Sequence, residues 1–539
     1  MKPFSLWATR NPERHRHFVT TSMQPTPDHP QPGGMSVRTW AARLLAVITL
    51  TTLLLPGNVT QGAESNLSGW EDSIVEMDVT RKQYDYTQPW TRRMQSRRKA
   101  GLVLEGHEIL TTADQVYDRT LVRIQKRGRG KWYIGDVTWI DYHANLAIVT
   151  TDEPGFWDDL KPISVPEGRS PSEAMQIVRW REGKLEMKNA EYSQYTVDTG
   201  DLSFVPRILL EISAEIQGVG WGEPVFSNGT LIGLSVQHNG NKITVLPASF
   251  IRPVLKARKQ GTYRGLGFFD FFWQAAVNPA SLEHLKLKGE PRGAIVIEVP
   301  SHPDQTPVLR PLDILLKIDG FDIDMQGDYQ DPNYGPLLLE NLATRGKWAG
   351  DAVPMTISRE GQELEILYRL PKAEFSTSLV PDATYDQAPE YLIAGGFVFQ
   401  PLNDPYLKAW GPDWKRRSPF RIYYFNNQAP TPEQPSLVLL SQVLPDVYNL
   451  GYQDIKYLVV RQVNGRQIAR LEDLHTALQN PPNGFHIIEF MESDSLRRLV
   501  VSAADLEAAT QRVLRRYGIA SDHYLSSESP AETVTTRKP

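Results

Sequence analysis

The stretch "IQGVGWGEPVF", from Ile216 to Phe226, lies inside a series of short runs rich in β-forming residues. Directly after it, residues 227–229 (Ser-Asn-Gly) have the composition of a hairpin turn. Short strands at close spacing, separated by turn residues, indicate an all-β barrel or sandwich. The sequence therefore predicts a mainly β domain over residues 73–258. The runs that carry this prediction span residues 101–110, 120–125, 132–140, 145–152, 207–213, 230–236 and 242–246.

Two smaller units are predicted after this domain. Residues 247–255 (PASFIRPVL) are expected to close the β domain as a helix, and residues 256–264 (KARKQGTYR) to form a polar linker. Strand-like runs such as "GAIVIEVP" and "LRPLDILLKIDG" then predict a second domain over residues 261–372. After a linker rich in Pro, Ser and Asp, further strand-like runs and the helical run "RLEDLHTAL" predict a third unit over residues 385–500.

The carboxyl end has a clear helical pattern over residues 502–518. Ser502 is expected to cap this helix, with Asp505 returning the hydrogen bond, and Gly518 to end it. Residues 519–539 are rich in Ser, Thr and Glu, and we expect them to form a disordered tail.

The length, composition and charge of the chain indicate a globular protein of several domains. The chain has 539 residues, of which 40% are hydrophobic and 22% charged, enough for about three globular domains. Its net charge of -5 gives no global reason to expect nucleic acid or an anionic membrane as a partner. The basic run from Arg92 to Lys99 is local, and is interpreted either as a solvated face or as a docking patch for an acidic partner.

The amino end has the pattern of an export signal. Arg38 and Arg43 precede an apolar run from Leu44 to Leu55, and small residues follow at 62–63. Residues 35–63 are therefore predicted to be a secretory signal peptide. Met35 would then be the true start of the protein, and residues 1–34 would be upstream sequence that follows a start codon chosen too early. The apolar run is too short for a stable membrane span. We expect a periplasmic or secreted protein.

The chain has no cysteine, which excludes disulfides, thiol catalysis and thiolate metal sites. The histidines show no paired helical spacing of the kind that binds zinc, so neither a metal site nor a cofactor is expected.

Three segments resemble the HtrA (Deg-type) family of trypsin-like serine proteases with PDZ domains. In that family, segments reading like "ILTNAHVV", "CDLALL" and "INPGNSGGPVF" carry the catalytic histidine, aspartate and serine. The corresponding segments here are "ILTTADQV", "ANLAIV" and "IQGVGWGEPVF", which place Asp114, Asn145 and Trp221 at the three positions. The resemblance implies a mainly β fold, in which a trypsin-like double β-barrel is followed by two PDZ-like α+β domains.

Each of these three residues departs from what acyl transfer requires. The reaction needs an oxygen or sulfur nucleophile, a base beside it and an acceptor that orients the base. The indole of Trp221 is no nucleophile, Asp114 has no hydroxyl at the expected place to activate, and Asn145 carries no charge. Val219 also replaces the family glycine that begins the serine loop, which puts the oxyanion hole in doubt. The sequence favours an inactive scaffold, in which Trp221 is a packing residue.

The alternative is a serine endopeptidase that uses non-standard residues. Ser227, Ser235 and His238 lie near Trp221 in sequence, but strand periodicity gives no reason to bring a serine against a histidine. Ser227 is assigned to a hairpin turn, and His107 is likewise interpreted as a turn residue.

The second and third units carry PDZ-like loops. Gly265, Leu266, Gly267 and Phe268 match the carboxylate-binding loop of PDZ domains, in which backbone N–H groups bind a peptide's terminal carboxylate. Arg264 or Lys259 either assists such an anion or is simply solvated. The third unit has "AGGF" from Ala394 to Phe397 and a long insertion, and resembles the degenerate second PDZ unit of Deg-type proteases.

Together these features predict an exported HtrA-like pseudoprotease that binds peptide C-termini or unfolded polypeptides. It would act as a quality-control scaffold, a chaperone or a regulator of active relatives. The resemblance also implies self-association, as a homotrimer or in a mixed assembly with active relatives.

Overall fold

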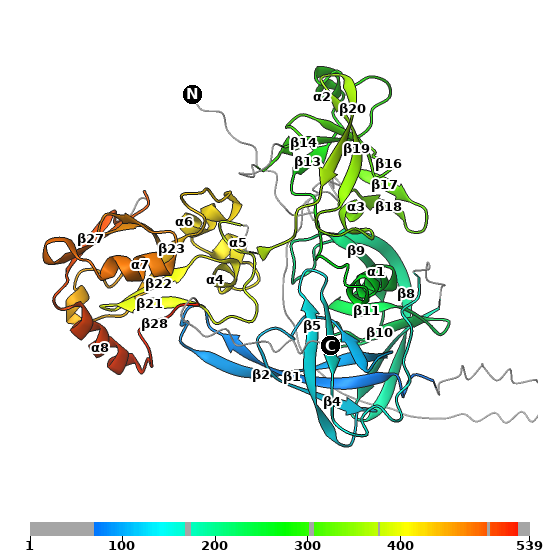
Figure 1. Cartoon of the computed structure of the whole chain (residues 1–539), viewed down its shortest axis with the longest axis horizontal. Coiled ribbons are helices and arrows are strands. Elements are labelled where there is room, and N and C mark those ends of the chain that lie inside the picture. The colour runs from blue at the N-terminus through cyan, green and yellow to red at the C-terminus, as the bar shows by residue number, and fades with distance from the viewer. Residues whose placement is uncertain (1–68, 168–173, 301–306, 376–377, 493–495, 527–539) are drawn as a thin grey trace, which may run out of the picture. The chain divides into compact units, whose positions relative to one another are not determined.

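The computed structural model describes residues 69–167, 174–300, 307–375, 378–492 and 496–526. The chain divides into two compact units, residues 1–69 and 70–539, and all but one of the described residues belong to the second. The predicted upstream segment and signal peptide (residues 1–63) lie outside the described residues. Strands predominate in the described chain, as expected for a double barrel followed by PDZ-like domains (Figure 1).

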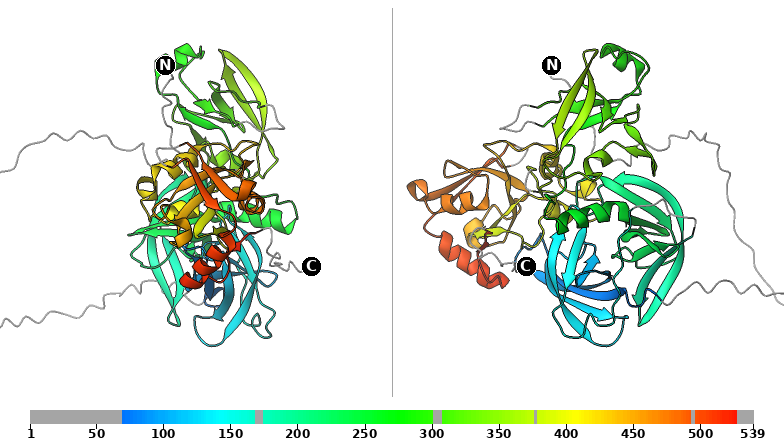
Figure 2. Two further views of the ribbon diagram at one scale, coloured as in Figure 1. Left: turned by 90° about the vertical axis from the view of Figure 1, so that its left-hand side faces the viewer. Right: turned by 45° about the vertical axis from the view of Figure 1, so that its right-hand side comes forward.

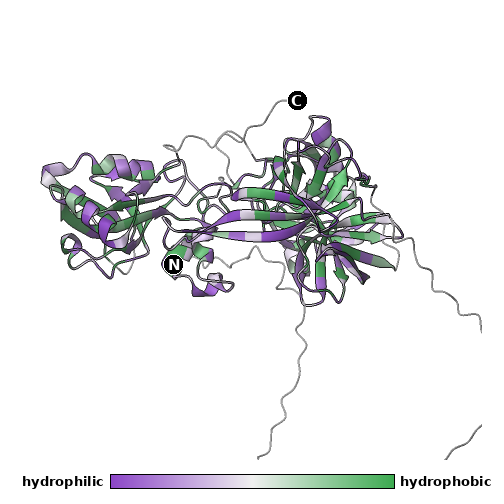
Figure 3. Ribbon diagram, turned by 90° about the horizontal axis from the view of Figure 1, so that it is seen from below, coloured by the Kyte–Doolittle hydropathy of each residue, from purple (hydrophilic) through white to green (hydrophobic). Residues whose placement is uncertain are grey.

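Six strands close into a first barrel in the order β1-β2-β3-β6-β5-β4. The long hairpin of β1 and β2 pairs Ile74 with Leu102 at its base and Tyr84 with Arg92 at its tip. The first seven residues of β2 are exposed or half-buried, and they form a largely hydrophilic stretch (Figure 3), whereas its last six are buried in the barrel. The strands are β1 (Ile74–Tyr84), β2 (Arg92–Leu104), β3 (Glu108–Thr111), β4 (Arg119–Lys126), β5 (Trp132–Asp141) and β6 (Leu146–Thr150).

Six more strands close into a second barrel in the order β10-β11-β12-β9-β8-β7, whose curved strands are seen in the right-hand view of Figure 2. The turn between β10 and β11 has φ of 47° at Asn228 and 78° at Gly229, which confirms the predicted hairpin. These strands are β7 (Met175–Arg181), β8 (Lys184–Asp198), β9 (Arg207–Ser213), β10 (Pro224–Ser227), β11 (Thr230–Asn239) and β12 (Lys242–Pro247).

Helix α1 (Ala248–Lys259) follows the second barrel, as the sequence predicts. It buries Phe250, Ile251 and Val254 on one face. The helix is longer than expected, because residues 256–259 of the predicted polar linker form its last turn.

The second unit is a six-stranded sheet in the order β13-β14-β15-β19-β20, with β16 beside β15. Strand β13 is an edge strand, since β14 is its one neighbour among the described strands. The elements are β13 (Phe272–Ala275), α2 (Pro279–His284), β14 (Ala294–Glu298), β15 (Ile314–Ile318), β16 (Phe321–Asp322), the hairpin of β17 (Asp328–Asp331) and β18 (Gly335–Leu338), α3 (Asn341–Thr344), β19 (Ala352–Arg359) and β20 (Gln362–Arg369).

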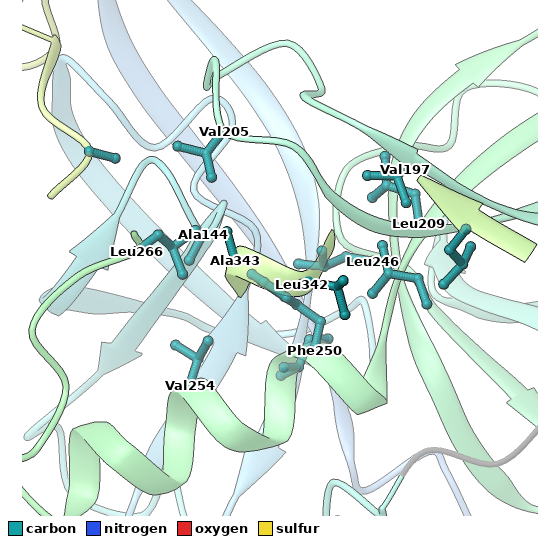
Figure 4. Close-up of a cluster of buried hydrophobic side chains, with 14 of the residues drawn as sticks. Ala144, Val197, Val205, Leu209, Leu246, Phe250, Val254, Leu266, Leu342 and Ala343 are labelled. Atoms are coloured by element: carbon teal, nitrogen blue, oxygen red, sulfur yellow. The ribbon is translucent and has the colours of Figure 1, made fainter. Parts of the chain in front are cut away.

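One apolar cluster joins the barrels to this second unit. It contains Phe250 and Val254 of α1 together with Leu266, Leu342 and Ala343 of the second unit. Figure 4 shows Phe250 beside Leu342, with Leu246 of β12 close to both. Side chains from the barrels, from α1 and from the second unit are buried against one another in this cluster, so the barrels and the second unit share one core.

The third unit is an eight-stranded sheet in the order β27-β26-β24-β23-β22-β21-β28, with β25 beside β24. The long insertion that the sequence placed here forms short helices. The elements are β21 (Tyr391–Ala394), β22 (Phe397–Pro401), α4 (Asp404–Lys408), α5 (Trp414–Arg417), α6 (Phe420–Tyr423), η3 (Tyr424–Asn427), β23 (Val438–Val443), η4 (Val447–Asn449), β24 (Leu458–Val463), β25 (Arg466–Gln467), α7 (Leu471–Leu478), η5 (Pro482–Gly484), β26 (Phe485–Phe490), β27 (Arg498–Ser502), α8 (Leu506–Tyr517) and β28 (His523–Tyr524).

The carboxyl end differs from its prediction at two points. Ser502 does not cap a helix: it is the last residue of β27, and α8 begins at Leu506 with Asp505 at the N-cap position and no side-chain capping bond. The stop at Gly518, with φ of 65°, is as predicted. The expected disorder of residues 519–539 is wrong for its first part, because β28 pairs with β21 through His523 and Tyr524. The third unit therefore extends beyond residue 500.

Candidate active site

Two of the three predicted triad positions meet at one end of the first barrel. The backbone N–H of Asp114 donates a hydrogen bond of 3.0 Å to Oδ1 of Asn145. Asn145 is buried and has φ of 53°, and its own N–H donates to the carbonyl of Tyr142. The Asp114 carboxylate is half-buried and accepts from the side-chain amide of Gln115. Asn145 thus positions the backbone of Asp114 rather than the side chain of a base.

Trp221, the third position, approaches the same place from the second barrel. Its carbonyl accepts a 3.2 Å hydrogen bond from the N–H of Ala100 on β2. The next residue, Gly222, lies so close to the first barrel that an added Cβ would be 3.0 Å from Oγ1 of Thr111. The guanidinium of Arg97 stands 4.6 Å from the centre of the indole ring. The structure therefore brings all three positions to the junction of the barrels, with a cation stacked on the indole.

Glu223 is a site residue that the sequence reasoning missed. Its side chain is 4% exposed, and Oε2 accepts hydrogen bonds from the N–H of Gly220 at 2.9 Å and of Trp221 at 2.8 Å. The same oxygen accepts from the hydroxyl of Ser235. The signal was present in the sequence, because the family pattern "GNSGGP" has glycine where "VGWGEP" has Glu223.

This carboxylate occupies donors that acyl transfer would need. A protease stabilises its oxyanion with backbone N–H groups, one of them belonging to the nucleophile's own residue. Here the N–H of Trp221 is already paired with a negatively charged, buried oxygen. A developing oxyanion at this point would meet a like charge instead of a free donor.

Lys99 is a second unforeseen member of the site. Its ammonium is buried and donates to Oγ1 of Thr112 at 2.7 Å and to the carbonyl of Asp114 at 2.6 Å. Burial lowers the pKa of Lys99 to about 8, and the charges of Asp114 and Glu223 oppose this shift. The last residue of the basic run is therefore part of the core, and the interpretation of the whole run as a solvated face is wrong here.

The serines near Trp221 are used structurally. Ser235 binds Glu223, and the hydroxyl of Ser227 donates to the carbonyl of Ala174. His107 lies in the turn between β2 and β3 with φ of 57°, as predicted, and stacks on Trp157.

A serine and a histidine do meet elsewhere. Nδ1 of His143 lies 3.0 Å from Oγ of Ser203, and burial lowers the pKa of His143 to about 4, so its imidazole is neutral near pH 7. Ser203 is 6% exposed and its oxygen also accepts from the N–H of Val205. Sixty residues separate the pair, and no motif links them, so pattern reasoning could not find it.

The predicted carboxylate-binding loop lies between α1 and β13. Gly265 has φ of 88°, and the carbonyls of Gly265 and Leu266 accept hydrogen bonds from Ala349 and Ala373. Leu266 is buried in the shared core, and Phe268 packs edge-on against Phe204 of the second barrel. The loop is thus held firmly ahead of the edge strand β13. Its binding of a carboxylate stays a prediction.

Comparisons with known proteins point to the same family as the motifs. Residues 380–526 match the family described as "PDZ domain". Over 410 residues, 75% of this chain and 79% of the relative, the sequence is 25% identical to "Putative protease Do-like 13" of Arabidopsis thaliana. "Putative protease Do-like 12, mitochondrial" from the same plant is 25% identical over 523 residues, 90% of this chain and 97% of the relative. This chain is similar to HtrA/Deg-type proteases with PDZ domains.

A solved structure titled "HtrA-type protease AlgW with decapeptide" aligns with 56% of this chain and 95% of its own, at 15% identity and a TM-score of 0.42. Within the described ranges of this chain, His, Asp and Glu residues form no group of three or more that could hold a metal ion. The same ranges contain no helix long and apolar enough to cross a membrane.

Basic residues near the first PDZ-like loop already have partners. Arg264 pairs with Asp351, and Lys259 lies 3.9 Å from Glu108. Either would have to leave its carboxylate before it could assist a bound anion.

The corresponding loop of the third unit is bonded to other parts of the same unit. The N–H of Gly395 donates a 2.8 Å hydrogen bond to the hydroxyl of Thr510 on α8. The carbonyl of Gly395 accepts a 2.9 Å hydrogen bond from the side-chain amide of Asn449. Strand β22 follows the loop, and β21 already pairs with its outer edge. A peptide could not add to β22 without displacing β21, so this PDZ unit is closed.

Proposed function

We propose that this chain is a catalytically inactive HtrA/Deg-type protein that binds polypeptides without cutting them. The observation that carries the proposal is the hydrogen bonding of Glu223. Its buried carboxylate takes the N–H of Trp221 and of Gly220, and the side chain at position 221 is an indole. The turn is therefore stabilised by its own carboxylate.

The proposal follows from two requirements of acyl transfer that this turn does not meet. Acyl transfer requires an activated nucleophile, and the hydroxyl of Ser235, beside this turn, donates to Glu223. It also requires donors preorganised for the oxyanion, and those of the turn are paired. A protease that has lost a triad residue can still accelerate hydrolysis about 10³- to 10⁴-fold over water through substrate binding and an intact oxyanion hole. We do not expect this residual rate here, because the donors of the turn are paired.

Polypeptide binding is assigned to the first PDZ-like unit. Strand β13 has one neighbour among the described strands, so its other edge can pair with an extended peptide. The loop of Gly265–Phe268 precedes this edge, at the place where such a peptide would end. The bound species would be peptide C-termini or unfolded chains, and a homotrimer or a mixed assembly with active relatives would raise avidity.

The test uses the chain from residue 64 onward, incubated with reduced, carboxymethylated α-lactalbumin. We expect mass spectrometry to recover the α-lactalbumin intact, and size-exclusion chromatography to show it co-eluting with the protein. A fluorophosphonate probe, with trypsin as the positive control, should label no serine. Labelling of the protein, or cleavage of the α-lactalbumin at defined sites, would contradict the proposal.

The second candidate function is a serine endopeptidase with a relocated nucleophile. It is favoured by the 3.0 Å contact between Ser203 and a neutral His143. If the probe labels the protein, S203A should abolish the labelling and S235A, the matched control, should leave it.

Export is proposed on the pattern of residues 35–63, with the periplasm as the destination. Expression of the full chain in a Gram-negative host, followed by fractionation and amino-terminal sequencing, tests it. A mature terminus near residue 64 in the periplasmic fraction is expected. An uncleaved chain in the cytosol would contradict export.

A further inference from the structure

The segment Thr384–Asp386 lies against loops of both barrels, although it belongs to the linker ahead of the third unit. The hydroxyl of Tyr385 donates a 2.9 Å hydrogen bond to the carbonyl of Leu202, and the hydroxyls of Thr384 and Tyr86 are 3.0 Å apart. These are contacts between residues at least 183 positions apart in sequence. We call Thr384–Asp386 the strap.

The ring of Tyr385 fills an aromatic slot. Its centre lies 4.3 Å from that of Tyr142 and 5.0 Å from that of Tyr117, and Phe375 closes the third side at 5.4 Å. Burial is the main cause that raises the pKa of the Tyr385 phenol. A slot built of three rings and one carbonyl acceptor selects an aromatic side chain with a hydroxyl at its tip.

The next residue, Asp386, meets three donors. The backbone N–H of Asp118 lies 2.8 Å from Oδ1, the hydroxyl of Tyr142 donates to Oδ2, and the guanidinium of Arg119 lies 3.5 Å away. An N–H, a phenol and a guanidinium converging on one carboxylate form an anion site. A neutral amide would lose the ion pair with Arg119 and put its N–H₂ group against a donor.

This slot adjoins the predicted triad positions. Tyr117 follows Asp114 by three residues, and the carbonyl of Tyr142 accepts from the N–H of Asn145. The negative charge of Asp114 is among the causes that raise the pKa of Tyr385. The strap therefore lies against the loops that carry Asp114 and Asn145.

We propose that the slot beside Asp114 is a polypeptide-binding subsite for an aromatic residue followed by an acidic residue, and that the chain's own Tyr385–Asp386 occupies it as a tethered competitor. This inference rests on the proposed function, since it names the chemistry of one polypeptide that the protein would bind. A partner carrying Tyr-Asp in an extended segment would displace the strap and take over its hydrogen bonds.

The test measures binding of a fluorescein-labelled ten-residue peptide with a central Thr-Tyr-Asp, by fluorescence anisotropy. The chain from residue 64 onward is compared with its Y385A/D386A variant. A tethered segment competes at an effective concentration near the millimolar range, so removing it should tighten binding at least tenfold. Replacing Tyr by Ala or Asp by Asn in the peptide should each weaken binding to the variant at least fivefold.

Two further variants keep the result interpretable. Adding Y142F and R119M to Y385A/D386A removes donors of the anion site without touching the strap, and should cancel the gain. If Y385A/D386A does not fold, as judged by thermal unfolding, D386N alone should give a smaller gain in the same direction. Equal affinity of both chains for the peptide, or equal affinity of the variant for Tyr-Asp and Ala-Asp peptides, would overturn the proposal.

Carboxymethylated α-lactalbumin in the same assay separates this inference from the proposed function. If the polypeptide binds but removing the strap changes nothing for the Tyr-Asp peptide, the subsite is wrong and the proposed function stands. If neither chain binds the polypeptide or the peptide, both are wrong.

Discussion

At the residue scale, Glu223 stabilises the turn that would otherwise hold a nucleophile. One carboxylate oxygen serves three donors, from Gly220, Trp221 and Ser235, in a place with almost no access to water. Unpaired buried donors each cost about 1–3 kcal/mol. Glu223 stands where the family pattern has a glycine, and it supplies structural hydrogen bonds to this turn.

We predict that E223A lowers the free energy of unfolding by about 2–4 kcal/mol, because it leaves these donors buried and unpaired. Urea unfolding followed by tryptophan fluorescence measures it. E223Q is the matched control: it retains a carbonyl oxygen as acceptor and should cost about half as much. A loss below 0.5 kcal/mol for E223A would mean that water replaces the carboxylate.

The raised pKa of Asp118 predicts that the stability of the protein depends on pH. Burial, and next the charge of Asp386, raise its pKa to about 7, while Arg81 and Lys82 oppose the shift. The unfolded value is near 3.9, so the folded state binds the extra proton between about pH 4 and 7. By linkage, the stability associated with this group is fully present below pH 4 and is lost as the pH rises through 7.

D118N removes this titration and should therefore stabilise the protein at pH 8 relative to the wild type. After allowance for solvent screening of this half-buried group, we expect a gain of about 1–2 kcal/mol at pH 8 and a much smaller one at pH 5. Thermal unfolding at both pH values measures it. D386N, which removes the facing charge, should move the pH window of the wild-type effect downward. A D118N gain that is equal at pH 5 and 8 would contradict the assignment.

At the element scale, the strands were largely predictable and the packing between distant elements was not. The short β-rich runs predicted most barrel strands but missed β1, β7 and β8. Asn228-Gly229 predicted a hairpin because two successive positive φ angles favour such residues. The position of β28 could not be read from its sequence, since two polar-flanked residues carry no periodicity. These residues form a strand because they pair with β21, which lies more than 120 residues away in sequence.

At the site, motif alignment predicted the triad-equivalent positions Asp114, Asn145 and Trp221, but not what surrounds them. Lys99 belongs to a basic run and has no local signal for burial. Ser203 meets His143, and Tyr385 meets Tyr142, only because loops of the folded chain converge. Sequence spacing carries no information on such long-range contacts in the absence of a known motif.

The closing strand β28 gives an element-scale prediction. A chain ending at Ala520 loses the hydrogen bonds that Tyr391 and Ile393 make to residues 521–522, and it exposes the edge of β21. We expect a loss of about 2–3 kcal/mol in the unfolding of the third unit, together with aggregation, because an uncovered strand edge pairs with other chains. Urea unfolding and light scattering measure these effects. A chain ending at Ser526 is the control and should behave like the full chain, whereas equal behaviour of both truncations would contradict the role of β28.

At the scale of the whole molecule, the distribution of buried clusters decides which parts unfold together. The barrels, α1 and the second unit share one apolar cluster that includes Leu342, whereas Leu440 belongs to a cluster built from the third unit alone. A structural change in the second unit should thus be felt in the barrels, and hence near the triad positions. This coupling would let a peptide bound at β13 influence the junction of the two barrels.

The two leucines test this coupling directly, because both are fully buried and each truncation to alanine should cost about 2–4 kcal/mol. Hydrogen exchange read by mass spectrometry should show that L342A reduces protection in α3 and also in α1, whose Phe250 lies in the same cluster. L440A should reduce protection within the third unit and leave α1 unchanged. If L342A affects α3 alone, the shared cluster does not couple the two units, and peptide binding at β13 could not reach the barrels through this core.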